Sequence, residues 1–147
     1  CAKPGNTLVQ IHDTAVDVLV DGLLQLKIMQ GSKSEIISQG HFRPFYPHGT
    51  SHWIGMDVHD VGIYYSESEP IKLEPGMYFS VEPGLYFDPE VLIQQNPNMP
   101  ATNQANLAAC AGIGIRIEDD VSVTAQGGNE VLTKAIAKEV ADVDQRY

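Results

Sequence analysis

Residues 112–124, GIGIRIEDDVSVT, alternate in character at every position, and this pattern restricts the fold most. A period of two is that of a β-strand, whose successive side chains point to opposite faces. One face is expected to carry Ile113, Ile115 and Ile117, and the other Gly112, Gly114, Arg116 and Glu118. Residues 77–87, MYFSVEPGLYF, alternate similarly up to a break at Pro83-Gly84. The sequence therefore predicts two strands that each carry a glutamate, Glu82 or Glu118.

An amphipathic helix is predicted over residues 6–29, where apolar side chains recur at spacings of three and four. Thr7 and Gln10 fit a capping box, in which each side chain accepts a hydrogen bond from the other residue's backbone N–H. Gly31 is expected to end this helix, because glycine readily takes the left-handed conformation found after helices.

The remaining segments predict shorter elements. Ser32 and Glu35 form a second capping-box pattern, ahead of a short helix that stops near Gly40. Residues 88–111 are polar and contain proline, asparagine and alanine, so we expect an irregular excursion there. Residues 130–133 predict a short strand, and the tail after them is expected to be helical.

The charge balance limits the classes of partner. Asp and Glu number 19 against 9 Lys and Arg, which gives a net charge of -10. Nucleic acids and anionic lipid surfaces need a basic face, so we expect neither as a partner. Cys1 and Cys110 lack Cys-x-x-Cys spacing, which favours reduced thiols and a cytoplasmic location. No apolar run approaches the ~20 residues of a membrane span.

Three of the five histidines, His48, His52 and His59, fall within HGTSHWIGMDVHD. Neutral imidazole offers a nitrogen lone pair that suits a divalent transition metal. The proline and glycines around these residues disfavour a helix, and the H-E-x-x-H pattern of zinc proteases is absent. On spacing alone, a hydrogen-bonded loop and a metal site both stay open.

The two strand glutamates also allow two interpretations. Glu82 precedes a Pro-Gly turn and fits a solvated strand end, whereas Glu118 fits a surface pair with Arg116. Asp119 and Asp120 are taken as turn or solvent residues. If carboxylates from separate strands met one imidazole, the mixed site would suit manganese, cobalt, iron or zinc better than calcium.

Three segments in order, HGTSHWIGMDVHDVG, LEPGMYFSVEPGLYF and GIGIRIEDDVSVT, carry a resemblance to a known family. They are similar to the C-terminal portion of the proline-specific metallopeptidases aminopeptidase P and prolidase, of metallopeptidase family M24. The resemblance runs from about residue 4 to the end of the chain. It implies an α+β fold of the pita-bread type, with a curved, mostly antiparallel sheet and helices on one face.

The resemblance also implies a metal site. His52 takes the position of the metal-ligating histidine, and Glu82 that of a ligand of the same metal that assists proton transfer. Glu118 takes the position of the glutamate that bridges two metals. In the full-length enzyme two manganese ions are expected, with cobalt, zinc or iron as alternatives, and one ion or none in this chain.

The resemblance also implies catalytic roles for several residues of this sequence, and Glu82 is one of them. His48 and His59 take positions that contact the substrate and stabilise the tetrahedral intermediate. Arg116 matches an arginine that lies near the metal carboxylates. The substrate implied is a proline-containing peptide, cleaved at its N-terminal Xaa-Pro bond.

The chain departs from the family where it begins. The family's site also uses two aspartates on a hairpin before the first helix, and here nothing precedes Cys1. Asp13, Asp17 and Asp21 do not replace them, because a spacing of four belongs to one helix, and His12 does not match a further family histidine. We therefore expect residues 1–147 to be the C-terminal portion of a single catalytic domain that lacks its N-terminal part.

Several expectations follow for the chain itself. It should be an inactive fragment, whether a processed product, a cloned piece or a sequence with a tag removed. The absent half should leave an apolar face exposed, which favours a homo-oligomer. Two alternatives stay open: a non-enzymatic pita-bread module that binds a peptide or protein, and a prolidase- or creatinase-type hydrolase.

Overall fold

The computed structural model describes residues 1–95 and 98–144, and these fall into two units. Residues 1–12, 50–82 and 117–144 form the first unit. The second unit contains residues 13–49 together with the described residues between 83 and 116.

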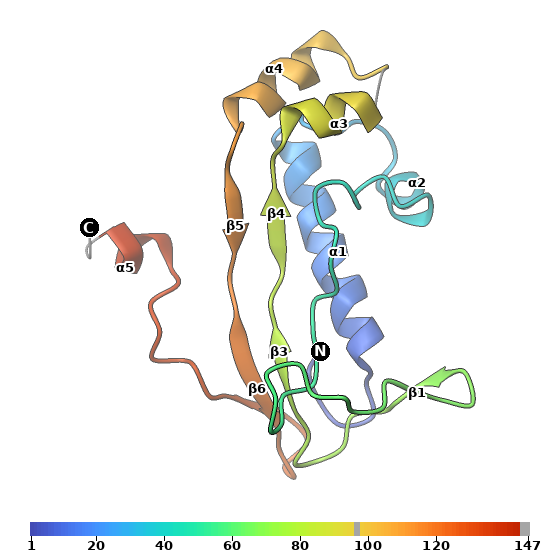
Figure 1. The fold of residues 1–147 in the computed structure, drawn as a ribbon, viewed down its shortest axis with the longest axis vertical. Helices are drawn as coiled ribbons and strands as arrows, with labels where there is room; N and C mark the ends of the chain where they lie inside the picture. Colours follow the sequence, from blue (N-terminus) through green and yellow to red (C-terminus); the bar gives the residue numbers. More distant parts are fainter. Residues whose placement is uncertain (96–97, 145–147) are drawn as a thin grey trace. The chain divides into compact units, whose positions relative to one another are not determined.

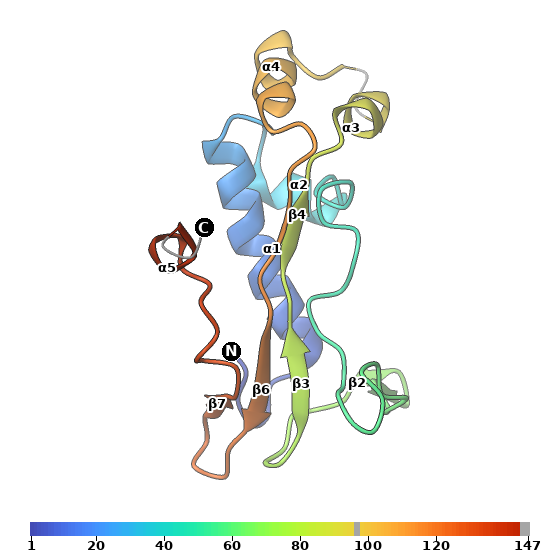
Figure 2. The same cartoon turned by 60° about the vertical axis from the view of Figure 1, so that its left-hand side comes forward.

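The first unit is built around an antiparallel sheet in the order β3-β6-β7, drawn side by side in Figure 2. Its strands are β3 (Tyr78–Val81), β6 (Asp119–Val123) and β7 (Asn129–Val131). A short hairpin of β1 (Tyr65–Ser66) and β2 (Glu69–Pro70) and the helix α5 (Val140–Asp144) complete the unit. β7 covers part of the strand predicted over residues 130–133, and within the predicted helical tail the described residues form the helix α5.

Alternation along β3 and β6 gives this sheet two different faces, as the sequence predicts. Phe79 lies opposite Val121 in the register, and both pack with Trp53 in the core of the unit. Ser80 lies opposite Asp120, so the intervening positions form a polar face. Ser80 and Asp120 thus lie on the face of the sheet opposite to the Phe79–Val121 core.

The second unit combines helices with a two-stranded antiparallel ladder (Figure 1). Its helices are α1 (Leu8–Gln25), which begins in the first unit, α2 (Lys33–Ser38), α3 (Pro89–Gln95) and α4 (Ala101–Ala109). Its strands are β4 (Gly84–Tyr86) and β5 (Gly114–Arg116). Among the described residues, none of the helices has the length and apolarity that crossing a membrane requires.

The structure confirms how α1 was predicted to begin, but not where it was predicted to end. The capping box is confirmed: Thr7 N–H donates to Gln10 Oε1 at 2.9 Å, and Gln10 N–H to Thr7 Oγ1 at 3.2 Å. The predicted end at Gly31 is wrong, because Lys27 already takes the left-handed conformation with φ of 54°. Ile28 N–H then reaches Leu23 O at 3.0 Å, which closes a Schellman motif.

Residues 88–111 were expected to be irregular, and this expectation is wrong for the part that the structure describes. They contain α3 and α4, and Leu92 and Leu107 from these helices are buried in one core cluster with Leu23. Asn106 Nδ2 donates to the carbonyls of residues 26 and 27, and so satisfies acceptors left over at the end of α1. Burial of two leucines explains why a weakly patterned segment folds into helices.

The prediction of a second capping box at Ser32 and Glu35 is wrong. Ser32 stands at the N-cap of α2, but its side chain makes no capping hydrogen bond. The helix itself lies where it was predicted and stops before Gly40. Its single buried residue, Ile36, packs with Val20 and Tyr46, so tertiary packing stabilises this short helix in place of a cap.

Candidate metal centre

Residues 50–54 run beside β3 as an additional extended segment of the first unit. Trp53 bridges Phe79 in antiparallel fashion, and Ser80 N–H donates to His52 O at 3.0 Å. Glu82 N–H donates to Thr50 O at 2.7 Å. β3 therefore has β6 on one side and the histidine segment on the other.

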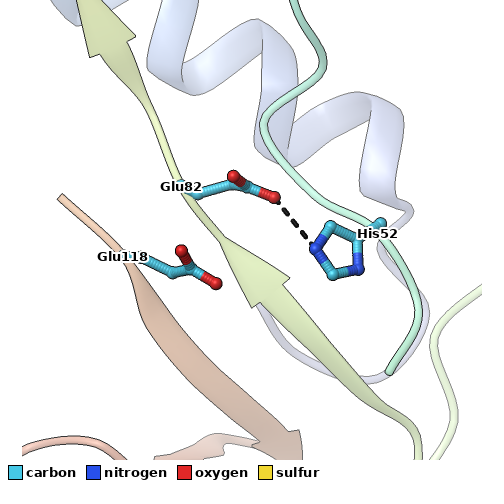
Figure 3. Close-up of side chains that lie close together, drawn as sticks. All are labelled: His52, Glu82 and Glu118. Carbon is cyan, nitrogen blue, oxygen red and sulfur yellow. Dashed lines mark ion pairs between the residues drawn. The ribbon is translucent and has the colours of Figure 1, made fainter. Parts of the chain in front are cut away.

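This arrangement brings His52, Glu82 and Glu118 together on the polar face. Val81 pairs with Asp119, so one further step of the same register places Glu82 opposite Glu118. Figure 3 shows the two carboxylates pointing into the same space, with the His52 ring beside Glu82. One ligand atom from each residue lies within 4.8 Å of those of the other two.

His52 presents one particular nitrogen to this space. Its Nδ1 lies 3.0 Å from the carbonyl oxygen of Trp53, which can only accept, so Nδ1 carries the hydrogen. Nε2 is left facing Glu82 Oε1 at a distance of 3.0 Å. A backbone carbonyl behind a ring nitrogen is the usual device that orients a metal-ligating histidine.

The donor set fits a divalent transition metal. With bonds of about 2.0–2.2 Å, two ligand atoms on one ion stand at most roughly 4.4 Å apart. The observed limit of 4.8 Å exceeds this by a few tenths of an ångström, which a small side-chain rotation would close. One imidazole with two carboxylates matches the preferences of manganese, cobalt, iron or zinc.

A closed loop places His59 next to His52. The indole Nε1 of Trp53 donates to Ile63 O at 3.1 Å, and the Trp53 N–H donates to Tyr64 Oη at 3.2 Å, so both ends of the loop meet at Trp53. The His59 ring contacts the His52 ring edge-on, with centroids 4.4 Å apart. His59 is exposed, and its ring nitrogens make no hydrogen bond to the residues that the structure describes.

His48 and Arg116 belong to the second unit, where Tyr86 joins them. Arg116 Nε donates to Tyr86 Oη at 2.8 Å, and Tyr86 Oη lies 2.9 Å from His48 Nε2. His48 Nδ1 lies 2.8 Å from Gly49 O and carries the hydrogen of that bond. The hydrogen bonds run in one direction, from Arg116 through Tyr86 and His48 to a backbone carbonyl.

Sequence reasoning missed Tyr86, because an aromatic residue in an alternating strand is usually a packing residue. Gly84 gave a signal that could have found it. A Cβ on Gly84 would lie 2.9 Å from Tyr86 Oη and 3.1 Å from Ile115 O, so a side chain at this position would crowd the tyrosine hydroxyl.

The expectation that Asp119 and Asp120 are turn or solvent residues is wrong, since both lie in β6. Asp119 Oδ1 accepts from Lys138 Nζ at 2.5 Å and from Thr133 Oγ1 at 2.7 Å. Burial would raise the pKa of Asp119, but these two hydrogen bonds and the Lys138 charge together hold it below its usual value. Burial, with the charge of Asp120 beside it, raises the pKa of Tyr78.

Known proteins resemble this chain over nearly its whole length. The sequence profile of metallopeptidase family M24 matches residues 1–125. The Xaa-Pro aminopeptidase of Escherichia coli K12 is 40% identical over 142 residues, which are 97% of this chain and 29% of that protein. The solved aminopeptidase PepP of Pseudomonas aeruginosa matches with a TM-score of 0.83 and 41% identity, over 97% of this chain and 29% of its own.

A zinc-substituted E. coli aminopeptidase P in complex with product matches with a TM-score of 0.79 and 40% identity, again over 97% of this chain and 29% of its own. The chain thus spans 29% of the length of these relatives. The likeness confirms the expected α+β fold, the C-terminal portion of a pita-bread domain. Metallopeptidases use a divalent metal and act on peptides. The chain belongs to metallopeptidase family M24.

Proposed function

We propose that the protein containing this chain hydrolyses the bond between an N-terminal residue and proline, in a reaction that depends on a divalent metal. The convergence of His52, Glu82 and Glu118 carries the proposal. Relatives named Xaa-Pro aminopeptidase, at 40% identity, support the choice of bond. Because the chain spans 29% of their length, the activity is proposed for a longer protein.

His52, Glu82 and Glu118 would hold the metal. When bound, a divalent ion supplies positive charge that polarises the peptide carbonyl and makes a water molecule more acidic. The Glu82 carboxylate would accept the proton of the attacking water and return it to the leaving proline nitrogen. Its side chain is 10% exposed, so bulk water competes little for that proton.

His59 is proposed to donate a hydrogen bond to the substrate carbonyl as negative charge develops on it. The exposed ring and the lack of a hydrogen bond to its nitrogens within the described residues support this role. His48 is proposed to support substrate binding together with Arg116, to which Tyr86 joins it. Both nitrogens of His48 already have partners within the chain, so His48 would act through the hydrogen-bond chain that Tyr86 completes.

Further proposals concern the whole protein. Two manganese ions are proposed, with cobalt, zinc or iron as alternatives, because Glu118 could bridge two ions if further carboxylates came from outside these residues. Residues 1–147 are proposed as the C-terminal portion of one catalytic domain, inactive alone and self-associating. The exposed Ile115 of β5 and the exposed Ile113 directly before that strand support self-association. A cytoplasmic location stays a prediction.

The test compares Xaa-Pro and Xaa-Ala peptides. The full reading frame that contains these residues should cleave Xaa-Pro peptides with added manganese and leave matched Xaa-Ala peptides intact. The 147-residue chain, assayed in parallel with its mass in solution measured, should be inactive and larger than a monomer. Robust cleavage by a monomeric chain would show that the site is complete within these residues, and preference for Xaa-Ala would refute the proposed substrate.

A further inference from the structure

Ser80 is a polar residue with no exposed surface, in the middle of β3. Serine is seldom buried completely unless its hydroxyl is hydrogen-bonded. The Ser80 side chain lies on the polar face of the sheet, two residues before Glu82 and beside His52 on the neighbouring segment. It therefore lies between two of the three candidate ligands.

The Ser80 hydroxyl makes a hydrogen bond to each of these ligand residues. The backbone N–H of His52 donates to Ser80 Oγ at 3.1 Å. Ser80 Oγ lies 3.1 Å from Glu82 Oε1, and because a carboxylate oxygen accepts, the hydroxyl hydrogen points to Glu82. One hydroxyl thus accepts from the backbone of one ligand and donates to the side chain of the other.

These two hydrogen bonds restrict the orientation of the Glu82 carboxylate and the position of the His52 backbone. The bond to Glu82 Oε1 limits rotation of the carboxylate, which otherwise turns about its last side-chain bond with little preference. The bond from the His52 N–H, with Ser80 N–H donating to His52 O at 3.0 Å, fixes the backbone from which the imidazole extends. Neither ligand can move far without breaking a bond to the same serine.

We propose that Ser80 is a positioning residue that holds Glu82 and His52 in the arrangement one divalent metal requires. This inference rests on the proposed metal centre and adds to it a residue that binds no metal itself. Groups that orient metal ligands from behind change metal affinity strongly although they never touch the ion. Loss of the hydroxyl would remove one of the bonds that orient the Glu82 carboxylate and leave the partly buried His52 N–H without its acceptor.

The chain offers a matched control one residue before His52. Ser51 Oγ is also buried, and it has no hydrogen-bond partner within the described residues. Ser51→Ala therefore removes the same atom from the same neighbourhood without removing a bond. Ser80→Thr keeps the hydroxyl, whereas Ser80→Cys keeps the volume with a much weaker donor.

The experiment measures manganese affinity of the 147-residue chain by the disappearance of the free-ion electron paramagnetic resonance signal. Ser80→Ala and Ser80→Cys should raise the dissociation constant about 10- to 100-fold, whereas Ser80→Thr and Ser51→Ala should keep the wild-type value. Equal affinity of Ser80→Ala and wild type would overturn the proposal, and so would an equal loss in Ser51→Ala. Ser80→Cys keeps the test valid if the alanine variant unfolds.

A second measurement needs no metal. Hydrogen exchange of the His52 amide should be faster in Ser80→Ala than in wild type, while the Glu82 amide, bonded to Thr50 O, should keep its protection. If the wild-type 147-residue chain binds no manganese, in keeping with the expectation of one ion or none for this part of the protein, the His52 amide still decides whether Ser80 positions the ligand. Unchanged exchange in Ser80→Ala would then overturn the positioning role.

Discussion

The two clusters of functional side chains differ in how their charges are arranged. In the first unit, Glu82 and Glu118 bring two carboxylates to one imidazole, that of His52. In the second unit, Tyr86 joins the Arg116 guanidinium to the His48 ring in a series where each donor meets an acceptor. The first cluster gathers like charges, whereas the second satisfies its own hydrogen-bonding groups.

This difference shows what holds each cluster in place. Two carboxylates at such a distance repel each other, so their own interactions do not explain why they lie together. The backbone register of β3 and β6 and the hydrogen bonds of residues 50–54 impose the arrangement. The Arg116–Tyr86–His48 series stabilises itself. Two carboxylates that the fold holds together against their mutual repulsion form a site that a cation would complete.

The largest expected effect breaks the first cluster. Glu118→Ala should abolish metal binding and, in the full reading frame, Xaa-Pro cleavage, because one of three converging ligands is lost. His59→Ala should keep the metal and lower the turnover number by about 10²–10³-fold, the loss seen when one stabilising donor is removed. Metal content and turnover measured on both variants check this division, and equal loss of metal in both would refute it.

A smaller effect is expected from the second cluster. Tyr86→Phe removes the hydroxyl that accepts a hydrogen bond from Arg116 and donates one to His48. Because two hydrogen bonds are lost, we expect Xaa-Pro cleavage to fall about tenfold. Metal content should not change, because the ligands belong to the first unit. Tyr65→Phe, at an exposed tyrosine, is the matched control. Loss of metal in Tyr86→Phe would show that the two clusters are not separable.

The smallest effect concerns the strand that leads from Glu118. The pKa of Asp119 is lower in the folded protein than in the unfolded chain, where it is about 3.9. The ion pair with Lys138 therefore stabilises the fold above about pH 3.9, and this stabilisation disappears as the pH falls through the lower folded pKa. Lys138→Ala should cost about 0.5–1 kcal/mol at pH 7 and almost nothing near pH 2, since the pair is partly exposed.

Urea unfolding of wild type and Lys138→Ala at pH 7 and at low pH measures this difference. The exposed Lys134→Ala serves as the control variant and should leave the free energy of unfolding unchanged at both pH values. A destabilisation by Lys138→Ala that is equally large at low pH would mean that packing of the lysine stem, and not the ion pair, supports β6.

Much of the first unit could be predicted because its signals are local. The alternation predicts β3 and β6, and Pro83-Gly84 predicts the break between β3 and β4. Glu82 and Glu118 were expected within strands and instead lie one residue outside them, and residues 112–124 form two strands, β5 and β6, where one was expected. Family resemblance then selected His52 from among the histidines. Ser80 escaped notice, because a serine in an alternating strand looks like a solvent-facing residue until its burial is known.

The second unit was harder to predict because distant contacts decide its structure. α4 forms where Leu107 reaches a core assembled from other segments, and the sequence of residues 101–109 gives little sign of that burial. Lys27 takes the left-handed conformation that ends α1, although glycine, present at position 31, adopts it at lower cost. Tyr86 became visible as a functional candidate only when its hydroxyl was seen between His48 and Arg116.

Trp53, which closes the loop carrying His59, is the single tryptophan of the sequence. Ultraviolet excitation at the red edge of the absorption band would therefore excite one emitter, directly next to His52. Its indole is nearly buried, and its N–H is held by the carbonyl of Ile63. Opening of the loop would break that bond and shift the emission towards longer wavelength, so the candidate metal centre has an optical reporter that needs no label.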